Sequence, residues 1–277
     1  MVKRNKTSQY TIIGKSVRGA SHKRVGKACQ DSYKTVAAGG AVILAAADGH
    51  GSESCPFSKT GSVIAVNVFC KLLKDYYNSY TGNIDALITL LSREGDTTIA
   101  RAIAIEWKRR VEKAHRIRGR KFLKTQNGET DKPGIWRQYG STLLGLMVTP
   151  SFYFAFQLGD GDIVLVNKTE AKYPMQTEKI LGVETQSLSR ADAWEKVITI
   201  VRQLPQDDSQ YAFIMATDGF ANSYPNEESF LSTCVDYYAA IREHGADAVA
   251  ANLKAWLNET SENGSGDDIT VLICCNQ

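Results

Sequence analysis

Residues 41–52 read AVILAAADGHGS, an apolar run that ends at Asp48 and Gly49. The pair Gly39-Gly40 precedes this run, and Gly-Gly between two apolar segments predicts a β-hairpin whose strands cover residues 32–38 and 41–47. A carboxylate that directly follows a buried strand lies at the rim of the sheet, and a neighbouring glycine lets a ligand approach the backbone carbonyl. The stretch therefore predicts a β-sheet with a candidate site at its edge.

The same arrangement of a strand beside an aspartate occurs three more times in the chain. It is found in FAFQLGDGD (154–162), in AFIMATDGF (212–220) and, with the aspartates in front of the strand, in GSGDDITVLICC (264–275). A single Asp-Gly is common turn chemistry. Four converging carboxylates would raise one another's pKa unless a cation held them together. Oxygen ligands without His or Cys favour Mg²⁺, Mn²⁺ or Ca²⁺ over zinc.

The apolar periodicity on either side of these motifs predicts an α+β protein. Helices are predicted in two groups, with a break at Gly95 in the first group, and about nine strands fall mostly in antiparallel order. We expect one domain over residues 1–277. The predicted strands cover residues 10–17, 32–38, 41–47, 141–148, 152–158, 163–166, 197–201, 211–216 and 269–275, and the predicted helices 58–77, 84–91, 97–117, 227–243 and 247–259.

Composition excludes several classes of protein. The 33 basic and 30 acidic residues give a net charge of +3, which argues against a dedicated nucleic-acid-binding protein. The longest apolar run, residues 39–47, is too short to span a membrane, and the first twenty residues lack the apolar core of a secretory signal. We therefore expect a cytoplasmic protein. The six cysteines include no Cys-x-x-Cys pair, which argues against a zinc site.

Six short motifs together carry a resemblance to a known family. In order they are CQDSY (29–33), DGHGS (48–52), YGSTL (139–143), LGDGD (158–162), TDG (217–219) and DDITV (267–271). Their order and approximate spacing resemble those of the bacterial-type metal-dependent Ser/Thr protein phosphatases, the protein phosphatase 2C family, over about residues 14–273. The resemblance implies a four-layer αββα sandwich, with two antiparallel β-sheets flanked by helical pairs.

The resemblance also implies an activity, hydrolysis of phosphoserine and phosphothreonine on proteins by a metal-bridged water. Two Mn²⁺ or Mg²⁺ ions are implied, with a third, weaker ion as in bacterial members. Asp48 resembles the carboxylate that bridges the two ions, and the Gly49 carbonyl resembles a further ligand. Asp218 and Asp267 resemble the ligands that complete the pair, and Asp160 resembles the aspartate that holds the third ion together with Asp218.

Two further residues match the family next to these ligands. Asp31, in Gln30-Asp31, falls where the family has an acidic pair that acts on the metals directly or through water. His50 matches the histidine proposed as the general acid in eukaryotic members, so that His50 and Asp48 are the candidate catalytic residues. An imidazole with an ordinary pKa near 6.5 is a suitable proton donor for an alkoxide leaving group. The alternative for His50 is a solvated histidine in a turn.

Three departures from the family leave alternatives open. Gln30 stands where many members carry Glu. Asp268 replaces the common Asn, so that either Asp267 or Asp268 is the direct ligand. The phosphate-binding Arg of the family is not clearly placed; Arg24 and Lys27 are the candidates, and the alternative is that residues 22–24 form an exposed basic loop.

The segment 101–124 carries ten basic and two acidic residues on a predicted amphipathic helix. It is either a solvated face or a docking surface for an acidic or phosphorylated partner or for nucleic acid. We expect a phosphorylated protein as substrate, with a Ser/Thr kinase or its target as partner. We expect no membrane or nucleic-acid partner and a monomeric chain. The alternative functions are a catalytically weak module that binds phosphoproteins as a regulator and a calcium-binding structural protein.

Overall fold

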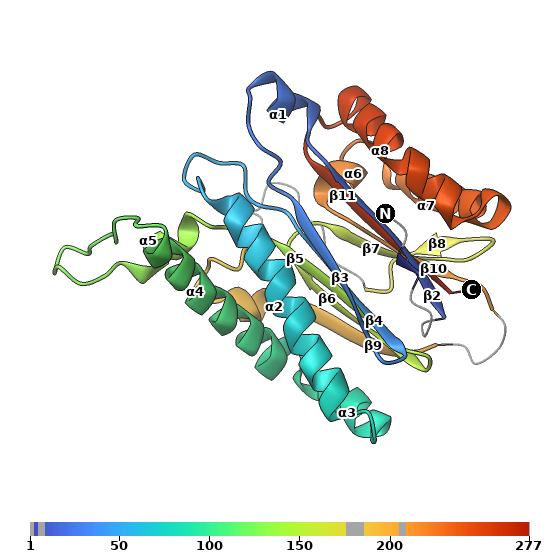
Figure 1. Ribbon diagram of the computed structural model, residues 1–277, viewed down its shortest axis with the longest axis horizontal. Coiled ribbons are helices and arrows are strands. Elements are labelled where there is room, and N and C mark those ends of the chain that lie inside the picture. The colour runs from blue at the N-terminus through green and yellow to red at the C-terminus, as the bar shows by residue number, and fades with distance from the viewer. Residues whose placement is uncertain (1–2, 5–8, 176–185, 205–208, 277) are drawn as a thin grey trace.

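Two antiparallel β-sheets lie face to face at the centre of the molecule in a computed structural model, which describes residues 3–4, 9–175, 186–204 and 209–276 (Figure 1). The first sheet has the order β1 (Lys3–Arg4), β2 (Tyr10–Val17), β11 (Ile269–Asn276), β10 (Ala212–Ala216), β7 (Asp162–Val166) and β8 (Ala171–Lys172). The second has the order β3 (Ser32–Ala38), β4 (Ala41–Ala47), β5 (Leu143–Val148), β6 (Phe152–Leu158) and β9 (Ile198–Gln203).

Helices cover the outer face of each sheet, which confirms the predicted αββα sandwich (Figure 1). The second sheet is covered by α2 (Ser58–Ser79), α3 (Ile84–Glu94) and α4 (Ala100–Ile117), with the short α5 (Lys132–Arg137) beside α4. The first sheet is covered by α7 (Glu227–His244) and α8 (Ala246–Asn263). Two more short helices, α1 (Ala20–Arg24) and α6 (Asp218–Ala221), lie at one end of the sandwich.

Strand β4 explains why its sequence is apolar at every position. Val42, Leu44 and Ala46 belong to the core between the two sheets, whereas Ile43 and Ala45 belong to the core under the helices. Side chains of a strand alternate between its two faces. A strand that is buried on both faces therefore reads as a continuous apolar run rather than as an alternating one.

The predicted helix break at Gly95 is wrong. A π-helical turn (Gly95–Ile99) joins α3 to α4 without an interruption of helical structure. The glycine is needed for a close approach instead, because a Cβ atom at Gly95 would lie 2.8 Å from Thr199 Oγ1 on β9. The described residues also form eleven strands instead of about nine, since β1 and β8 have two residues each, too few for a periodic pattern.

No helix among the described residues combines the length and the apolarity that a membrane crossing requires.

Candidate metal centre

Asp48 and Gly49 are fixed at the end of β4 by the neighbouring strand. Asp48 N–H donates to Thr142 Oγ1 at 3.0 Å, and Thr142 N–H donates back to the Asp48 carbonyl at 2.9 Å. Gly49 then forms an isolated β-bridge with Ser141. A Cβ atom at Gly49 would lie 2.8 Å from the Gln30 carbonyl oxygen, so only glycine fits at this position. The partly buried Asp48 side chain is thereby held at the rim of the second sheet.

Asp31 reaches the same point from the loop before β3, and it is 1% exposed. Its Oδ2 accepts a hydrogen bond from Thr217 Oγ1 at 2.7 Å, and that hydroxyl accepts the Thr270 N–H at 2.9 Å. Thr217 follows β10 and Thr270 lies in β11, both in the first sheet. The other Asp31 oxygen, Oδ1, is buried without a hydrogen-bond partner in the part of the chain that the structure describes.

Asp218 and Asp267 come from the first sheet. Asp218 opens α6 directly after β10, and its Oδ2 accepts a hydrogen bond from Asn222 Nδ2 at 3.0 Å. The loop that carries Asp267 is tied to this turn because Ser265 Oγ donates to the Gly219 carbonyl at 2.8 Å. Asp267 Oδ1 accepts the N–H of the next residue at 2.7 Å. Two loops from neighbouring strands are therefore held against each other.

The carboxylates affect one another's protonation. Burial, followed by the negative charges of Asp31, Asp218 and Asp267, raises the pKa of Asp48 well above its usual value. Burial and then the charges of Asp160, Asp267 and Asp31 raise the pKa of Asp218 to about 7. Burial also raises the pKa of Asp31 to about 6. Each carboxylate therefore resists ionisation while its neighbours are ionised and no cation is present.

Asp267 and Asp268, adjacent in sequence, have different surroundings. Asp268 is 3% exposed, and its two oxygens accept the backbone N–H groups of Gly19 at 2.7 Å and Gln30 at 2.6 Å. His22 Nδ1 also lies 2.9 Å from Asp268 Oδ1. The side chain of Asp267 is 50% exposed, and its charge contributes to the raised pKa values of Asp48 and Asp218. The charge of Asp267 thus acts on the carboxylate cluster, whereas both oxygens of Asp268 accept backbone N–H groups. One ligand atom from each of His22, Asp267 and Asp268 lies within 4.8 Å of the other two.

Asp160 lies in the turn between β6 and β7. Gln157 Nε2 shapes this turn by donating to the carbonyls of Gly159 at 3.2 Å and Gly161 at 2.7 Å. The Asp160 charge raises the pKa of Asp218, but it is not among the main causes of the raised pKa of Asp48. Asp160 therefore lies on the Asp218 side of the cluster.

The remaining predicted site residues differ in their relation to the centre. The half-buried His50 donates its backbone N–H to the Gly140 carbonyl at 3.1 Å, and its ring packs against Gly140, where a Cβ atom would lie 2.6 Å from His50 Cδ2. Lys27 Nζ donates to the Gly51 carbonyl, so that the ammonium group lies at the DGHGS loop. The exposed Arg24 instead donates to Ser21 Oγ at 2.9 Å within α1.

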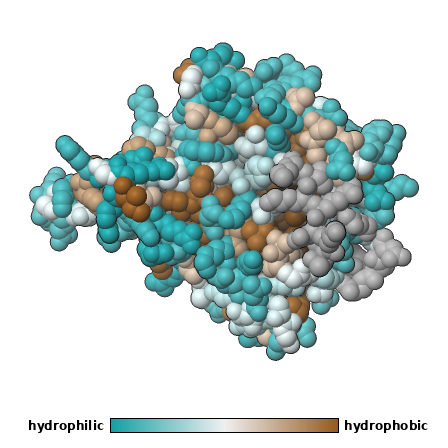
Figure 2. Space-filling view, viewed as in Figure 1, coloured by the Kyte–Doolittle hydropathy of each residue, from teal (hydrophilic) through white to brown (hydrophobic). Residues whose placement is uncertain are grey.

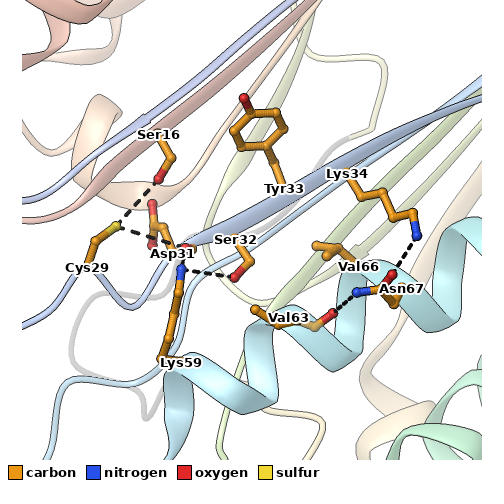
Figure 3. Close-up of a pocket in the computed structure, with 10 residues that line it drawn as sticks. All are labelled: Ser16, Cys29, Asp31, Ser32, Tyr33, Lys34, Lys59, Val63, Val66 and Asn67. Carbon is orange, nitrogen blue, oxygen red and sulfur yellow. Dashed lines mark hydrogen bonds between the residues drawn. The ribbon is translucent and has the colours of Figure 1, made fainter.

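A cleft of about 460 Å³ adjoins Asp31 on the side of α2 and β3 (Figure 3). Lys59, in the first turn of α2, donates from Nζ to the Asp31 carbonyl and to Ser32 Oγ at 3.3 Å. Burial raises the pKa of Cys29, which also lines this cleft, to about 11, so its thiol stays protonated and is a poor metal ligand.

Sequence reasoning singled out neither Lys59 nor Thr217. Lys59 gives no motif signal, whereas Thr217 stands inside the TDG motif and could have been considered there.

The donor set fits a hard divalent cation. Its side-chain members are carboxylates. One buried oxygen, Asp31 Oδ1, has no hydrogen-bond partner among the described residues. Repulsion between the carboxylates also favours a bound positive charge. Carboxylate and carbonyl oxygens are the ligands that Mg²⁺ and Mn²⁺ prefer.

Comparison with known families gives one match over most of the chain. A family model described as protein phosphatase 2C matches residues 18–258. No curated protein matches the sequence.

Solved structures with the same fold include three informative neighbours, all of low sequence identity. RsbX in complex with magnesium has 16% identity and a TM-score of 0.52, with 100% of this chain and 99% of that chain covered. The catalytic domain of the serine/threonine protein phosphatase PstP, with two manganese ions, has 13% identity, a TM-score of 0.59 and coverage of 97% and 99%. Stp1 from Staphylococcus aureus has 9% identity, a TM-score of 0.61 and coverage of 96% and 94%.

Proposed function

The chain belongs to the protein phosphatase 2C family, and we propose that Asp48, the Gly49 carbonyl, Asp218 and Asp267 hold the metal ions with which it hydrolyses phosphoserine and phosphothreonine on proteins. Family membership makes the chain a metal-dependent protein serine/threonine phosphatase. The observation that carries the residue assignment is the convergence of four strand-end carboxylates whose charges raise the pKa values of Asp48 and Asp218. In this proposal Asp31 acts beside Asp48, and Asp160 with Asp218 holds a third, weaker ion.

Mn²⁺ and Mg²⁺ are the proposed ions. The oxygen-only donor set supports this choice, as do the magnesium of RsbX and the manganese ions of PstP. When bound, such ions polarise the phosphoryl group and lower the pKa of water. Asp48 and Asp218 must give up any bound proton to receive a cation, because a protonated carboxyl is a poor ligand. Binding of metal is therefore coupled to the release of protons from this cluster.

His50 is the proposed general acid. It directly follows Asp48-Gly49, its backbone N–H is held by the Gly140 carbonyl, and its ring is only half-buried, so that it can exchange protons with water. The serine or threonine alkoxide is a poor leaving group, and protonation of its oxygen by His50 would assist departure.

Lys27 is the better supported of the two candidate phosphate-binding residues. Its ammonium group lies against the Gly51 carbonyl in the loop that carries His50, whereas the guanidinium of Arg24 is engaged within α1. A lysine supplies a compact positive charge with three donors, one of which is used by Gly51.

The chain acts as one domain over residues 1–277 in this proposal, because both sheets supply carboxylates to one centre. A Ser/Thr kinase or its target is the proposed partner, and a monomer in the cytoplasm is the proposed state. The monomeric state and the cytoplasmic location are supported by the sequence alone. Size-exclusion chromatography with light scattering tests the oligomeric state.

Hydrolysis of p-nitrophenyl phosphate by the full chain tests the proposed centre. We expect turnover with Mn²⁺, loss of turnover with EDTA, and loss of at least about 100-fold in Asp48→Asn, in line with the removal of a principal electrostatic group. The matched control is Asp236→Asn on the exposed face of α7, which removes the same charge outside the carboxylate cluster. Equal activity of wild type and Asp48→Asn would contradict the proposal and favour the module that only binds phosphoproteins.

A further inference from the structure

The basic segment 101–124 is not uniform in its charge pairing. In its first half, Glu106 forms ion pairs with Arg109 at 2.6 Å and Arg110 at 2.7 Å. From the last turns of α4 onward, six basic side chains follow, and among the described residues none of them takes part in an ion pair. We call this set the basic ridge; it comprises Lys113, Arg116, Arg118, Arg120, Lys121 and Lys124.

Two arginines of the basic ridge are fixed by polar and aromatic contacts. Arg118 donates from Nη1 to Thr60 Oγ1 at 2.6 Å. The Arg120 guanidinium carbon lies 3.2 Å from the centroid of the Phe57 ring, and the same side chain donates to the Tyr139 hydroxyl. A guanidinium has five N–H donors, so each arginine keeps further donors for an anion. Pre-ordered side chains also lose less conformational entropy when a ligand binds.

The contacts of Arg118 and Arg120 place this part of the basic ridge at the start of α2, which adjoins Gly49 of the proposed metal centre. Phe57 and Thr60 flank the start of α2, and Ser58 between them packs against Gly49, where a Cβ atom would lie 2.8 Å from the Ser58 carbonyl carbon. Figure 1 shows the end of α4 and α5 beside the start of α2. Figure 2 shows hydrophilic side chains with hydrophobic patches between them at that end of the molecule, where Ile117 and Leu123 are exposed. A protein segment bound at the centre would therefore pass close to the basic ridge.

We propose that the basic ridge is a docking surface for acidic side chains that flank the phosphorylated residue of the substrate protein. This inference rests on the proposed function of the centre. Six positive charges that form no ion pair within the described part of the chain complement an acidic segment, and arginine pairs with carboxylate or phosphate through two parallel hydrogen bonds. The proposed substrates are thus phosphoproteins with Asp, Glu or a second phosphate near the scissile phosphate.

An acidic protein fits this surface better than single-stranded nucleic acid does. Non-specific binding of a single strand combines positive charge with aromatic side chains on which bases stack. Within this segment Trp107 is fully buried, and the half-buried Phe122 packs edge-on against the His115 ring at 5.3 Å. The Phe57 ring below the basic ridge is covered by Arg120. The whole chain also has a net charge of only +3.

A pair of phosphothreonine peptides tests the proposal, one with Glu at the flanking positions and one with Gln. The variant Arg116→Glu/Arg118→Glu reverses two exposed charges of the basic ridge. We expect its KM for the acidic peptide to rise about tenfold, which corresponds to a few surface charge interactions. Its kcat, its KM for the Gln peptide and its turnover of p-nitrophenyl phosphate should stay within about twofold of wild type, since these require no acidic flank. Higher salt should reduce the preference of the wild type for the acidic peptide.

The matched control is Arg93→Glu/Lys254→Glu, which makes the same change of net charge at exposed positions on α3 and α8. Thermal melting verifies that both double variants are folded, and Arg116→Gln/Arg118→Gln should give a smaller effect in the same direction. The proposal would be overturned if KM rose equally for both peptides, or if the control variant raised KM for the acidic peptide as much as Arg116→Glu/Arg118→Glu does. The docking surface would also be overturned if Arg116→Glu/Arg118→Glu lost binding to a single-stranded oligonucleotide while its KM values for both peptides stayed unchanged.

Failure of the proposed function gives a different result. In that event the wild type has no metal-dependent turnover of p-nitrophenyl phosphate. The Kd of the labelled acidic peptide, measured by fluorescence anisotropy, is then compared instead of KM. Weaker binding in Arg116→Glu/Arg118→Glu than in the control then supports the docking surface, and equal binding overturns it.

Discussion

Asp31 and Thr217 join the two sheets at the metal centre through a 2.7 Å hydrogen bond between a buried carboxylate and a buried hydroxyl. Because the same hydroxyl accepts the Thr270 N–H, one side chain links the loop before β3 to both β10 and β11. The bond lowers the pKa of Asp31, against the larger effect of burial.

Thr217→Val removes this hydroxyl at nearly constant side-chain size. We expect a loss of about 1–3 kcal/mol in the free energy of unfolding, since the Asp31 oxygen and the Thr270 N–H are left buried without their partner. Urea titration measures this loss, and isothermal titration with Mn²⁺ should show weaker metal binding because the pKa of Asp31 rises. Thr217→Ser keeps the hydroxyl and is the control. If valine and serine variants had the same stability, the bond would have no role in holding the centre.

The metal-free protein should become less stable as the pH rises from about 5 to 8. The folded-state pKa values of Asp31 (about 6) and Asp218 (about 7) are raised, so their contribution to stability is present at low pH and lost as the pH passes these values. Melting curves in EDTA measure this slope. Mn²⁺ should raise Tm more at pH 8 than at pH 5.5 because the cation replaces protons at the cluster.

The control for this experiment is Asp218→Asn, which removes one of the titrating groups. Its metal-free melting temperature should depend less on pH over the same range. A wild-type protein whose Tm in EDTA rises steadily from pH 5 to 8, with the same slope in the variant, would contradict this account.

Substitution of Asp267 and Asp268 should affect different properties. Asp267→Asn should weaken Mn²⁺ binding at least about tenfold with little change in stability, because its side chain is half-exposed. Asp268→Ala should cost about 2–4 kcal/mol, because the buried N–H groups of Gly19 and Gln30 lose their acceptors. Calorimetry with Mn²⁺ and urea unfolding measure the two effects. The reverse pattern would assign the direct ligand to Asp268.

His50→Ala should lower the rate more for a phosphoserine peptide than for p-nitrophenyl phosphate. The serine alkoxide needs a proton as it leaves, whereas p-nitrophenolate needs little protonation. Loss of a general acid typically costs about 10²–10⁴-fold. Steady-state kcat on both substrates measures the difference, with His244→Ala on the exposed end of α7 as the control. Equal losses on the two substrates would leave His50 no role as proton donor.

The strand and helix patterns predicted the α+β class because the buried strands are strongly apolar, and the family resemblance implied the sandwich. The predicted limits of β3 and β4 agree with the structure, since both strands end at glycine or aspartate and β4 is apolar on both faces. The prediction of a helix break at Gly95 was wrong for a physical reason. The low helix preference of glycine does not reveal the close contact with Thr199 that requires a glycine at this position.

Within the proposed site, the sequence pointed to the carboxylates but not to the different surroundings of each. Asp267 and Asp268 are neighbours in the chain, and only the loop conformation leaves one half-exposed while the other accepts the backbone N–H groups of Gly19 and Gln30. Likewise, Arg24 and Lys27 are three residues apart, and the short helix α1 directs them to different partners. Lys59 lies in an ordinary first turn of a helix, and its contact with the Asp31 carbonyl depends on tertiary packing.

The position of β11 in the first sheet has a consequence for synthesis of the protein. This strand is built from residues 269–276, yet it lies between β10 and β2, the latter at residues 10–17. Asp267 and the Thr270 N–H arrive only with that strand, so a ribosome must extrude these residues before the centre can assemble. A growing chain that stops before residue 267 lacks Asp267 of the proposed donor set, so that phosphatase activity is expected to report on completed translation through β11.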